Sequence, residues 1–323
     1  MTASEPVRVA VVGAGALATR VHYPSLVDDP MAIIVGICDL DPQRLKSAGE
    51  QFDVSSTFTD YRAMIETVSP EAVYVIGQPE FMYGIWCWCL SQGLDLFIEK
   101  PLGLTLHQAT NLAYLAEANN CITQVGFRRR ASPLLQHAQS ILGEHGPTTH
   151  AVCSFYKCQP EAMLGARDHM MDDGVHAIDT LRAVCGGEVV DIHSVTRRVG
   201  TPDINFFSAQ LVFDTGATGI LINSWTSGRR VFAVDLHVPG ACAELDLEGV
   251  GHIYADGDTT GTEVTAQEIA GSDQFHVFGG FRQKTSQFLQ AVRSRQQPPS
   301  HFGDAIKTMR IAEQILHQSY AIS

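Results

Sequence analysis

The chain has 323 residues, of which 45% are hydrophobic and 18% are charged, a composition typical of a folded globular protein rather than a disordered one. Its 22 basic and 35 acidic residues give a formal net charge of −13, which argues against nucleic acid or an anionic membrane surface as a partner. At usual domain sizes, this length favours two domains.

The N-terminus and the cysteines indicate a reducing compartment. The first residues, MTASEPVRVA, lack a basic stretch followed by an apolar one, and the longest strongly apolar run, Phe81–Leu90, is too short to cross a bilayer. The eight cysteines form no Cys-x-x-Cys pair, which argues against zinc or a disulfide scaffold. We therefore expect a cytoplasmic protein without a metal site.

Over residues 1–126, short β-branched runs alternate with helical patterns. Strands are predicted at Val7–Val12, Ala32–Cys38, Ala72–Ile76, Leu94–Ile98 and Ile122–Val125. Helices are predicted at Leu17–Val27, from Pro42 with Asp41 as N-cap, at Phe81–Ser91 and near Thr105–Ala118. Apolar strands that alternate with helices are typical of a parallel sheet covered on both faces, so this part is expected to be a doubly wound α/β domain.

From residue 127 to residue 323, longer alternating strands dominate. They are predicted at His150–Tyr156, Phe206–Phe213, Gly219–Trp225, Phe232–Val238 and Ala241–Leu247. Helices are predicted at Pro133–Leu142, Asp173–Val184, Phe281–Arg295 and Asp304–Ser319. This order predicts a second, α+β domain with a large open, mainly antiparallel sheet.

The first predicted strand leads into Gly13-Ala14-Gly15-Ala16-Leu17-Ala18, which opens a helix. Gly13 permits a tight turn, Gly15 lets the backbone approach a pyrophosphate, and Ala18 is small enough for the helix to pack on the sheet. The helix N-terminus then presents N–H groups to the phosphates. Between a strand and a helix, this motif predicts a dinucleotide-binding domain, although the glycines can also serve only to turn the chain.

Asp39 ends the second strand, 21 residues after Ala18. A carboxylate there can accept hydrogen bonds from an adenosine 2′-hydroxyl and would repel a 2′-phosphate, so NAD(H) is favoured over NADP(H). The alternative is that Asp39 only caps the next helix. Arg20 and Arg44 are close enough in sequence to leave NADP(H) open.

Glu99-Lys100-Pro101 follows the predicted strand Leu94–Ile98 directly. Lys100 is therefore expected at the carboxyl edge of a parallel sheet, where open α/β sheets bind ligands. An ammonium there can hydrogen-bond a substrate oxygen and stabilise developing negative charge. The alternative is a surface lysine before a turn-forming proline.

Asp172, His176 and Asp179 lie four and then three residues apart, so a helix brings them to one face. A histidine beside carboxylates can take up and release a hydroxyl proton, which hydride transfer from an alcohol requires. The alternative is a helix N-terminus with a capping aspartate and a histidine packed on the sheet.

Together these features resemble the Gfo/Idh/MocA oxidoreductase family, which includes glucose–fructose oxidoreductase and inositol dehydrogenase. The similarity extends over essentially the whole chain and rests on GAGALA at 13–18, EKP at 99–101, VGFRRRASP at 125–133 and DDGVHAIDTLR at 172–182. It implies an N-terminal Rossmann domain and a C-terminal α/β domain that binds a sugar- or cyclitol-like substrate. It also implies a homodimer or homotetramer that assembles through the C-terminal sheet.

The resemblance also implies roles for single residues. Lys100 corresponds to the family's active-site lysine, His176 to its acid/base, Asp172 to the carboxylate that works with it, and Asp179 to a supporting position. The implied substrate-binding residues are Arg130, Arg167, Asp172, His176 and Tyr156. The implied cofactor-binding residues are Gly13, Gly15, Ala16, Leu17, Ala18, Asp39, Gln78, Pro79, Glu99 and Lys100.

Two segments depart from the family's pattern. Tyr83 stands where many members have a histidine, and Asp168–Met171 replaces a common glycine-rich run before the helix motif. His22 matches a frequent family position and is expected to be structural. These departures leave the reaction class intact and bear on the choice of substrate.

The sequence thus predicts an NAD(P)-dependent oxidoreductase that moves a hydride between nicotinamide and a sugar-, cyclitol- or related hydroxyl or ketone. In the oxidation direction, His176 would accept the hydroxyl proton and Lys100 would orient the oxygen. Two alternatives remain: an enzyme that uses NAD transiently for lyase or glycosidase chemistry, and a non-catalytic dinucleotide-sensing regulator.

Overall fold

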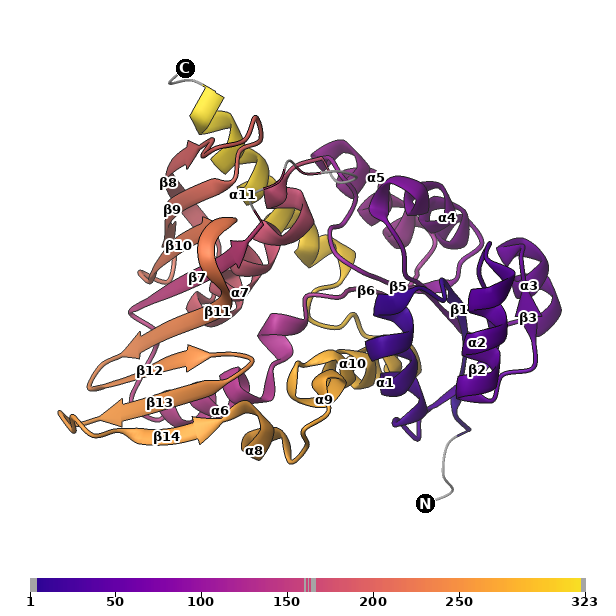
Figure 1. Cartoon of the computed structure of the whole chain (residues 1–323), viewed down its shortest axis with the longest axis horizontal. Helices are drawn as coiled ribbons and strands as arrows, with labels where there is room; N and C mark the ends of the chain where they lie inside the picture. Colours follow the sequence, from indigo (N-terminus) through magenta and orange to yellow (C-terminus); the bar gives the residue numbers. More distant parts are fainter. Residues whose placement is uncertain (1–4, 160, 162, 164–166, 321–323) are drawn as a thin grey trace. The chain divides into compact units, whose positions relative to one another are not determined.

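A computed structural model describes residues 5–159, 161, 163 and 167–320 of the chain, which divides into two compact units (Figure 1). The first unit comprises the residues up to Gly126 together with Phe281–Ile306. The second comprises Phe127–Gly280 and the chain from Lys307 onward. Among the described residues, no helix is both long enough and apolar enough to cross a membrane.

The first unit is built around a parallel sheet of six strands in the order β3-β2-β1-β4-β5-β6. The strands are β1 (Val7–Val12), β2 (Ala32–Cys38), β3 (Thr57–Phe58), β4 (Ala72–Val75), β5 (Asp95–Ile98) and β6 (Thr123–Val125). The connecting helices are the π-helix η1 (Ala18–His22), α1 (Tyr23–Val27), α2 (Pro42–Phe52), α3 (Tyr61–Val68), α4 (Pro79–Ser91) and α5 (Leu106–Ala118). The expected Rossmann fold is confirmed, and β3 and α3 are elements that the sequence patterns did not predict.

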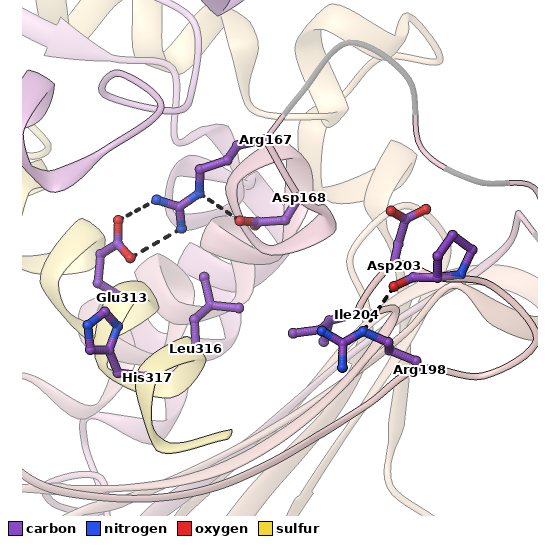
Figure 2. Close-up of a pocket in the computed structure, with 9 residues that line it drawn as sticks. Arg167, Asp168, Arg198, Asp203, Ile204, Glu313, Leu316 and His317 are labelled. Atoms are coloured by element: carbon purple, nitrogen blue, oxygen red, sulfur yellow. Dashed lines mark hydrogen bonds and ion pairs between the residues drawn. The ribbon is translucent and has the colours of Figure 1, made fainter. Parts of the chain in front are cut away.

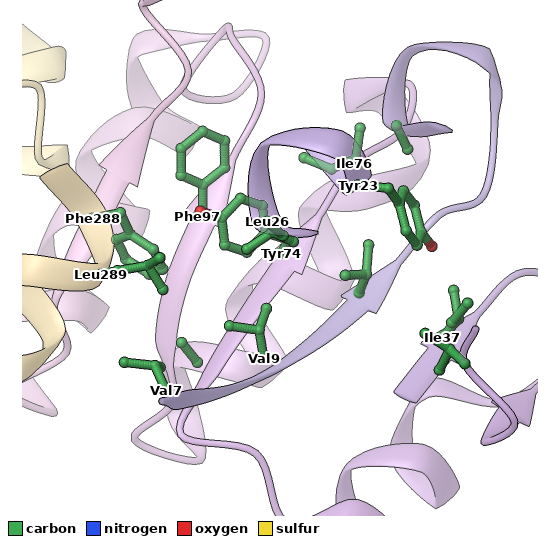
Figure 3. Packing of buried hydrophobic residues seen from close by; sticks show 14 of the residues in the cluster. Val7, Val9, Tyr23, Leu26, Ile37, Tyr74, Ile76, Phe97, Phe288 and Leu289 are labelled. Atoms are coloured by element: carbon green, nitrogen blue, oxygen red, sulfur yellow. The ribbon is translucent and has the colours of Figure 1, made fainter. Parts of the chain in front are cut away.

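The last part of the first unit comes from far along the chain. Helix α10 (Phe281–Ser294) buries Phe288 and Leu289 in the core, where Phe288 packs against the rings of Tyr74 and Phe97 (Figure 3). Beyond α10, the N–H of Val125 on β6 donates to the carbonyl of Ser300 at 3.0 Å. The sequence assigned this segment to the second domain, because the residues of an amphipathic helix do not show which sheet it will cover.

The second unit contains a sheet of eight strands in the order β14-β13-β12-β11-β7-β10-β9-β8. The β10–β7 pair is parallel and the other pairs are antiparallel, as expected for a mainly antiparallel sheet. The strands are β7 (His150–Cys158), β8 (Val189–Arg197), β9 (Phe206–Phe213), β10 (Thr218–Ser224), β11 (Thr226–Val238), β12 (Ala241–Asp246), β13 (Val250–Ala255) and β14 (Thr262–Thr265). The sequence patterns missed β8, β13 and β14.

Helices pack on one face of this sheet. Helix α7 (Val175–Cys185) lies against β7 and β10, and α6 (Pro133–Leu142) lies against β12 (Figure 1). The remaining helical elements are the 3₁₀ turn η2 (Arg128–Ala131), the π-helix η3 (Met170–Gly174), α8 (Ala266–Ala270), α9 (Phe275–Phe278) and α11 (Phe302–Tyr320). The residues between β7 and η3 that are described include Arg167 and Asp168 but not 164–166.

Candidate active site

The carboxyl ends of four neighbouring strands bring the predicted cofactor residues of the first unit to one edge. Gly13 follows β1, Asp39 follows β2, Gln78 and Pro79 follow β4, and Glu99 follows β5. The strand order reverses between β1 and β4, which is where open parallel sheets bind their ligands. Lys100 lies at the same edge, as predicted.

Gly13 lies in a position that only glycine can occupy. Its φ is +106°, and an added Cβ would be 1.9 Å from the carbonyl oxygen of Ile76 at the end of β4. The Gly13 N–H donates to the carbonyl of Cys38 at 2.7 Å, and the Tyr23 hydroxyl donates to the Gly13 carbonyl at 3.1 Å. The first glycine therefore joins β1, β2 and β4 at the point where the turn begins.

Gly15 has a different reason to be glycine. The nearest heavy atom to an added Cβ would be Arg44 Nη1 at 4.0 Å, so the fold leaves open space there. This space fits a pyrophosphate that approaches the backbone closely, as a dinucleotide requires. Ala16 and Leu17 are exposed at the start of the helix, whereas Ala18 is buried against the sheet as predicted.

The Asp39 carboxylate is held by the backbone on both sides. The Ala14 N–H donates to Asp39 Oδ2 at 2.7 Å, and the Asp41 N–H donates to Asp39 Oδ1 at 2.9 Å. The N-cap of α2 is Asp41, whose Oδ1 accepts from the Gln43 N–H at 2.8 Å. Asp39 is therefore not the cap of that helix, and each of its oxygens keeps a second acceptor position.

The side chain of Glu99 points into the interior of the first unit and is buried there among other residues of the protein. Its Oε1 is 2.9 Å from Nε2 of His22, both side chains are buried, and its Oε2 accepts from the Lys100 N–H at 3.2 Å. The rings of Tyr74, Phe97 and Phe281 surround His22 with their edges. The sequence placed Glu99 among the cofactor-binding residues; in this position it holds the backbone that presents Lys100.

In the second unit, Asp172 and His176 lie on consecutive turns of one helical segment. Asp172 is in the π-helix η3, and His176 is buried in the first turn of α7 with its ring 6.1 Å from that of Phe127. The sequence placed Asp172 and His176 on one face by the spacing of an α-helix. A π-helical turn is wider than an α-helical one, so that spacing does not by itself bring the two side chains to the same face. Such turns are rare and occur often at functional sites.

Asp179 and Arg130 form a buried pair. The carboxylate of Asp179 is fully buried and accepts from Nε of Arg130 at 2.7 Å and from its Nη2. This bidentate geometry fixes the guanidinium of Arg130 against α7. The pair ties the predicted substrate residue Arg130 to α7, the helix that contains His176, and the supporting role of Asp179 stays a prediction.

Arg167 lines a cavity of about 390 Å³ at the start of the η3 segment (Figure 2). Its Nη1 donates to Glu313 Oε1 on α11 at 2.5 Å, and its Nε donates to Asp168 Oδ2 at 2.7 Å. The other lining residues are Arg198, Pro202, Asp203, Ile204, Leu316 and His317. Arg167 is thus held by two carboxylates, and Asp168 is four residues from Asp172.

Tyr156 lies on the opposite face of the sheet from α7. Side chains alternate along a strand, and Phe155 and Lys157 of β7 both face the α7 side, where Lys157 pairs with Asp173. The predicted substrate residue Tyr156 therefore does not face α7, whereas its neighbour Lys157 does.

Tyr83, which departs from the family's pattern, accepts a hydrogen bond from the side-chain amide of Asn111 on α5 at 2.8 Å.

Comparisons with known proteins identify matching families for both units. The model described as the oxidoreductase family with an NAD-binding Rossmann fold matches residues 7–127, and the GFO/IDH/MocA C-terminal domain matches residues 142–240, so together they cover more than half of the chain. An uncharacterized oxidoreductase of Bacillus subtilis, YrbE, is 23% identical over 94% of this chain and 91% of its own. A myo-inositol 2-dehydrogenase of Thermotoga maritima is 24% identical over 92% of this chain and 91% of its own.

The solved structures show the same fold. A dehydrogenase from Chromobacterium violaceum matches with a TM-score of 0.89 at 22% identity, and the match covers 99% of this chain and 97% of that one. The agreement extends over both units rather than the Rossmann unit alone.

Gly15 in the turn and Gly84 in α4 predict different effects of a single added methyl group on NADH binding. Gly15→Ala should leave the free energy of unfolding unchanged within about 1 kcal/mol, since its Cβ has open space, and should weaken NADH binding at least about tenfold by blocking the pyrophosphate. Gly84→Ala, where no heavy atom lies within 4 Å, is the matched control and should bind NADH normally. NADH titration with urea unfolding measures both quantities, and wild-type affinity in Gly15→Ala would contradict the assignment.

The buried hydrogen bond between His22 and Glu99 predicts that variants of His22 differ in their free energy of unfolding. His22→Phe leaves Glu99 buried without its partner and should lower the free energy of unfolding by about 3 kcal/mol or more. His22→Gln keeps an N–H donor and should lose much less, while adding Glu99→Met to His22→Phe should recover stability. The exposed His107→Phe serves as control in urea unfolding. Equal losses for the Phe and Gln variants would show that shape, not the hydrogen bond, matters.

Proposed function

The chain belongs to the Gfo/Idh/MocA family of NAD-binding oxidoreductases, and we propose that it transfers a hydride between nicotinamide and a sugar- or cyclitol-like hydroxyl or ketone. The observation that carries the proposal is the Gly13–Ala18 turn, in which Gly13 is required by the fold and Gly15 leaves space for a pyrophosphate. The inositol dehydrogenase relative, which aligns over nearly the whole chain, supports the substrate class.

The chain's own residues divide the work of the reaction. The nicotinamide supplies the hydride acceptor or donor when bound. In the oxidation direction, the imidazole of His176 accepts the hydroxyl proton as a general base. The ammonium of Lys100 donates a hydrogen bond to the same oxygen and stabilises the negative charge that develops there. Asp172, one turn before His176, orients the imidazole, and Glu99 with His22 holds the backbone of Lys100 in place.

The cofactor is held at the carboxyl edge of the first sheet. Backbone N–H groups at the start of the helix after Gly15 receive the phosphates, and the fixed carboxylate of Asp39 accepts from the adenosine ribose. Gln78 and Pro79, where α4 begins beside the turn, line the same edge. Because Asp39 carries a negative charge, it favours a ribose with a free 2′-hydroxyl.

We also propose a homodimer or homotetramer that assembles through the eight-stranded sheet, in the cytoplasm. The support is the uneven covering of that sheet, since α6 and α7 pack on one face and Val195 and Ile220 on its strands are exposed. The eight cysteines are free thiols, as suits a reducing compartment.

Kinetics test the assignment of roles. Lys100→Met and His176→Ala should each lower kcat by about 100-fold to 10,000-fold on a sugar or cyclitol substrate, because each removes a group that acts in the transition state. NADH affinity should stay within about threefold of wild type in both variants. The exposed residues Lys46 and His193 provide the controls Lys46→Met and His193→Ala, which should keep full activity. Near-normal turnover in Lys100→Met and His176→Ala would refute the roles.

Cofactor choice tests the part played by Asp39. Protein freed of copurified cofactor should bind NADH at least about tenfold more tightly than NADPH, measured side by side by nicotinamide fluorescence. Asp39→Asn removes the charge and should narrow that difference. Arg44→Gln removes the cation nearest to Gly15 and should weaken only the remaining NADPH binding. Tighter binding of NADPH by the wild-type protein would overturn this use of Asp39.

A further inference from the structure

A group of cations gathers where β7 ends and β11 begins. We call it the basic cluster: Lys157 on β7, Arg128 and Arg129 on η2, and Arg230 on β11, with the carboxylates of Asp173 and Glu248. None of these residues has a role in the proposed chemistry. The four cations come from three separate parts of the chain, so the fold alone brings them together.

Glu248 serves three guanidinium groups at once. Its Oε1 accepts from Arg128 Nη2 at 2.5 Å and lies 2.9 Å from Arg129 Nη1, while its Oε2 accepts from Arg230 Nη1. Burial alone would raise the pKa of the Glu248 carboxyl, but Arg129, Arg230 and Arg128 hold it far below its ordinary value. One carboxylate therefore offsets the charge of only one of these three arginines.

Lys157 and Arg230 face the same side of the sheet as α7. Arg230 is two residues from Phe232, which is buried opposite Phe155 in the register of β11 and β7, and Lys157 is two residues from Phe155. The β11–β7 register shifts between Thr226 and Val231, and this irregularity leaves Arg230 beside the end of β7. Lys157 in turn pairs with Asp173, the residue after Asp172 on η3.

Arg129 shows that the cluster is short of negative charge. Its side chain is buried, its guanidinium lies 4.2 Å from the ring centroid of Phe232, and its Nε has no hydrogen-bond partner within the described part of the chain. Burial, together with the neighbouring charges of Arg128 and Arg230, lowers the pKa of Arg129 to about 9, although the carboxylates of Glu248 and Asp173 act to raise it. The carboxylates that the structure gives as acting on these four cations are those of Asp173, Glu248 and, for Arg230, Asp246, so positive charge remains in excess in a protein of net charge −13.

Such an excess is unfavourable unless an anion completes the site. Cations that are withdrawn from water and repel one another cost free energy, which a bound carboxylate or phosphate would offset through charge-assisted hydrogen bonds. Two members can reach a ligand from solvent, since the side chains of Arg230 and Lys157 are 49% and 22% exposed. Arginine is the residue best suited to planar or tetrahedral oxyanions.

We propose that the basic cluster binds an anionic group, a carboxylate or a phosphate, carried by the substrate of this enzyme. The proposal rests on the function proposed above and narrows its substrate class to acidic sugars or cyclitols and their phosphates. The pairing of Lys157 with Asp173 places the cluster next to Asp172 on η3. The anionic group would thus orient the substrate from the same helical segment that provides the acid/base residue.

The main alternative is that the cluster only ties η2 to the strand end at Glu248. Both cases predict that Arg129 and Glu248 matter for stability, so variants of these two residues do not separate them. Arg230 and Lys157 do, because both are accessible and neither is needed to bury apolar surface. Arg229 is an exposed arginine next to Arg230 that takes no part in the ion pairs of the basic cluster given above, and it is the matched control.

The test is calorimetric titration of malonate, inorganic phosphate and neutral malonamide into the protein saturated with NAD⁺, which occupies the phosphate-binding turn. We expect malonate or phosphate to bind at one site and malonamide not to bind. Arg230→Gln and Lys157→Met should each weaken the anion at least about tenfold, and Arg229→Gln should leave it unchanged. Absence of anion binding, or equal loss in Arg229→Gln, would overturn the proposal.

Turnover of matched sugars distinguishes a carboxylate from a phosphate as the anionic group. It also separates the proposed anion site from the proposed oxidoreductase function. D-glucuronate and glucose 6-phosphate differ from glucose only at C6, so the preferred member of this trio shows which anion the cluster takes. Selection of the neutral sugar by the wild-type protein would refute the cluster's role while leaving the oxidoreductase intact. Failure of the wild-type protein to bind NAD⁺ would instead refute the function itself.

Discussion

The approach of Gly13 to the carbonyl of Ile76 is the constraint on which the first unit depends. With an added Cβ only 1.9 Å from that oxygen, any other residue would push β1 away from β4 at the edge where the ligand binds. The hydrogen bond from the Gly13 N–H to the Cys38 carbonyl ties the turn to the end of β2. The hydrogen bond from the Ala14 N–H fixes the carboxylate of Asp39 beside the turn. One tight turn thus sets the position of the Asp39 carboxylate, and the residues at this edge of the sheet are placed by the packing of backbone rather than of side chains.

Buried hydrogen-bonded pairs likewise fix the surroundings of the predicted catalytic residues Lys100 and His176. His22 with Glu99 fixes the backbone of Lys100, and Asp179 with Arg130 fixes a guanidinium beside the helix of His176. Removing a charge from water is costly, so such a pair survives only when its geometry is well satisfied. Both pairs join segments far apart in the chain, 77 and 49 residues respectively. These two pairs therefore fix the positions of side chains and backbone more than they add to the free energy of unfolding.

The sequence predicted the Rossmann sheet, the glycine turn and the place of Asp39 at the end of β2, because those features depend on residues that are neighbours in the chain. It did not place α10 in the first unit, since the apolar face that contains Phe288 would suit either sheet. It treated Asp172 as α-helical, and only the structure shows the π-helical turn. Glu248 lies 120 positions from Arg128, and no local pattern could show that three arginines converge on it. The roles of Lys100 and His176 stay predictions.

The glycine turn and the proposed anion site would bind negative groups by different physical means, and this difference has consequences for an acidic protein. At physiological salt, charges separated by more than about 8 Å are largely screened, so a net charge of −13 weakens attraction to an anion without governing contacts at the site. Backbone N–H groups at the turn act at contact distance and add no net charge. The proposed anion site would also act at short range, but through the charged side chains of the basic cluster beside η3. An anionic substrate would therefore gain little from long-range steering, and its selection would depend on how closely its charged group meets Arg230 and Lys157.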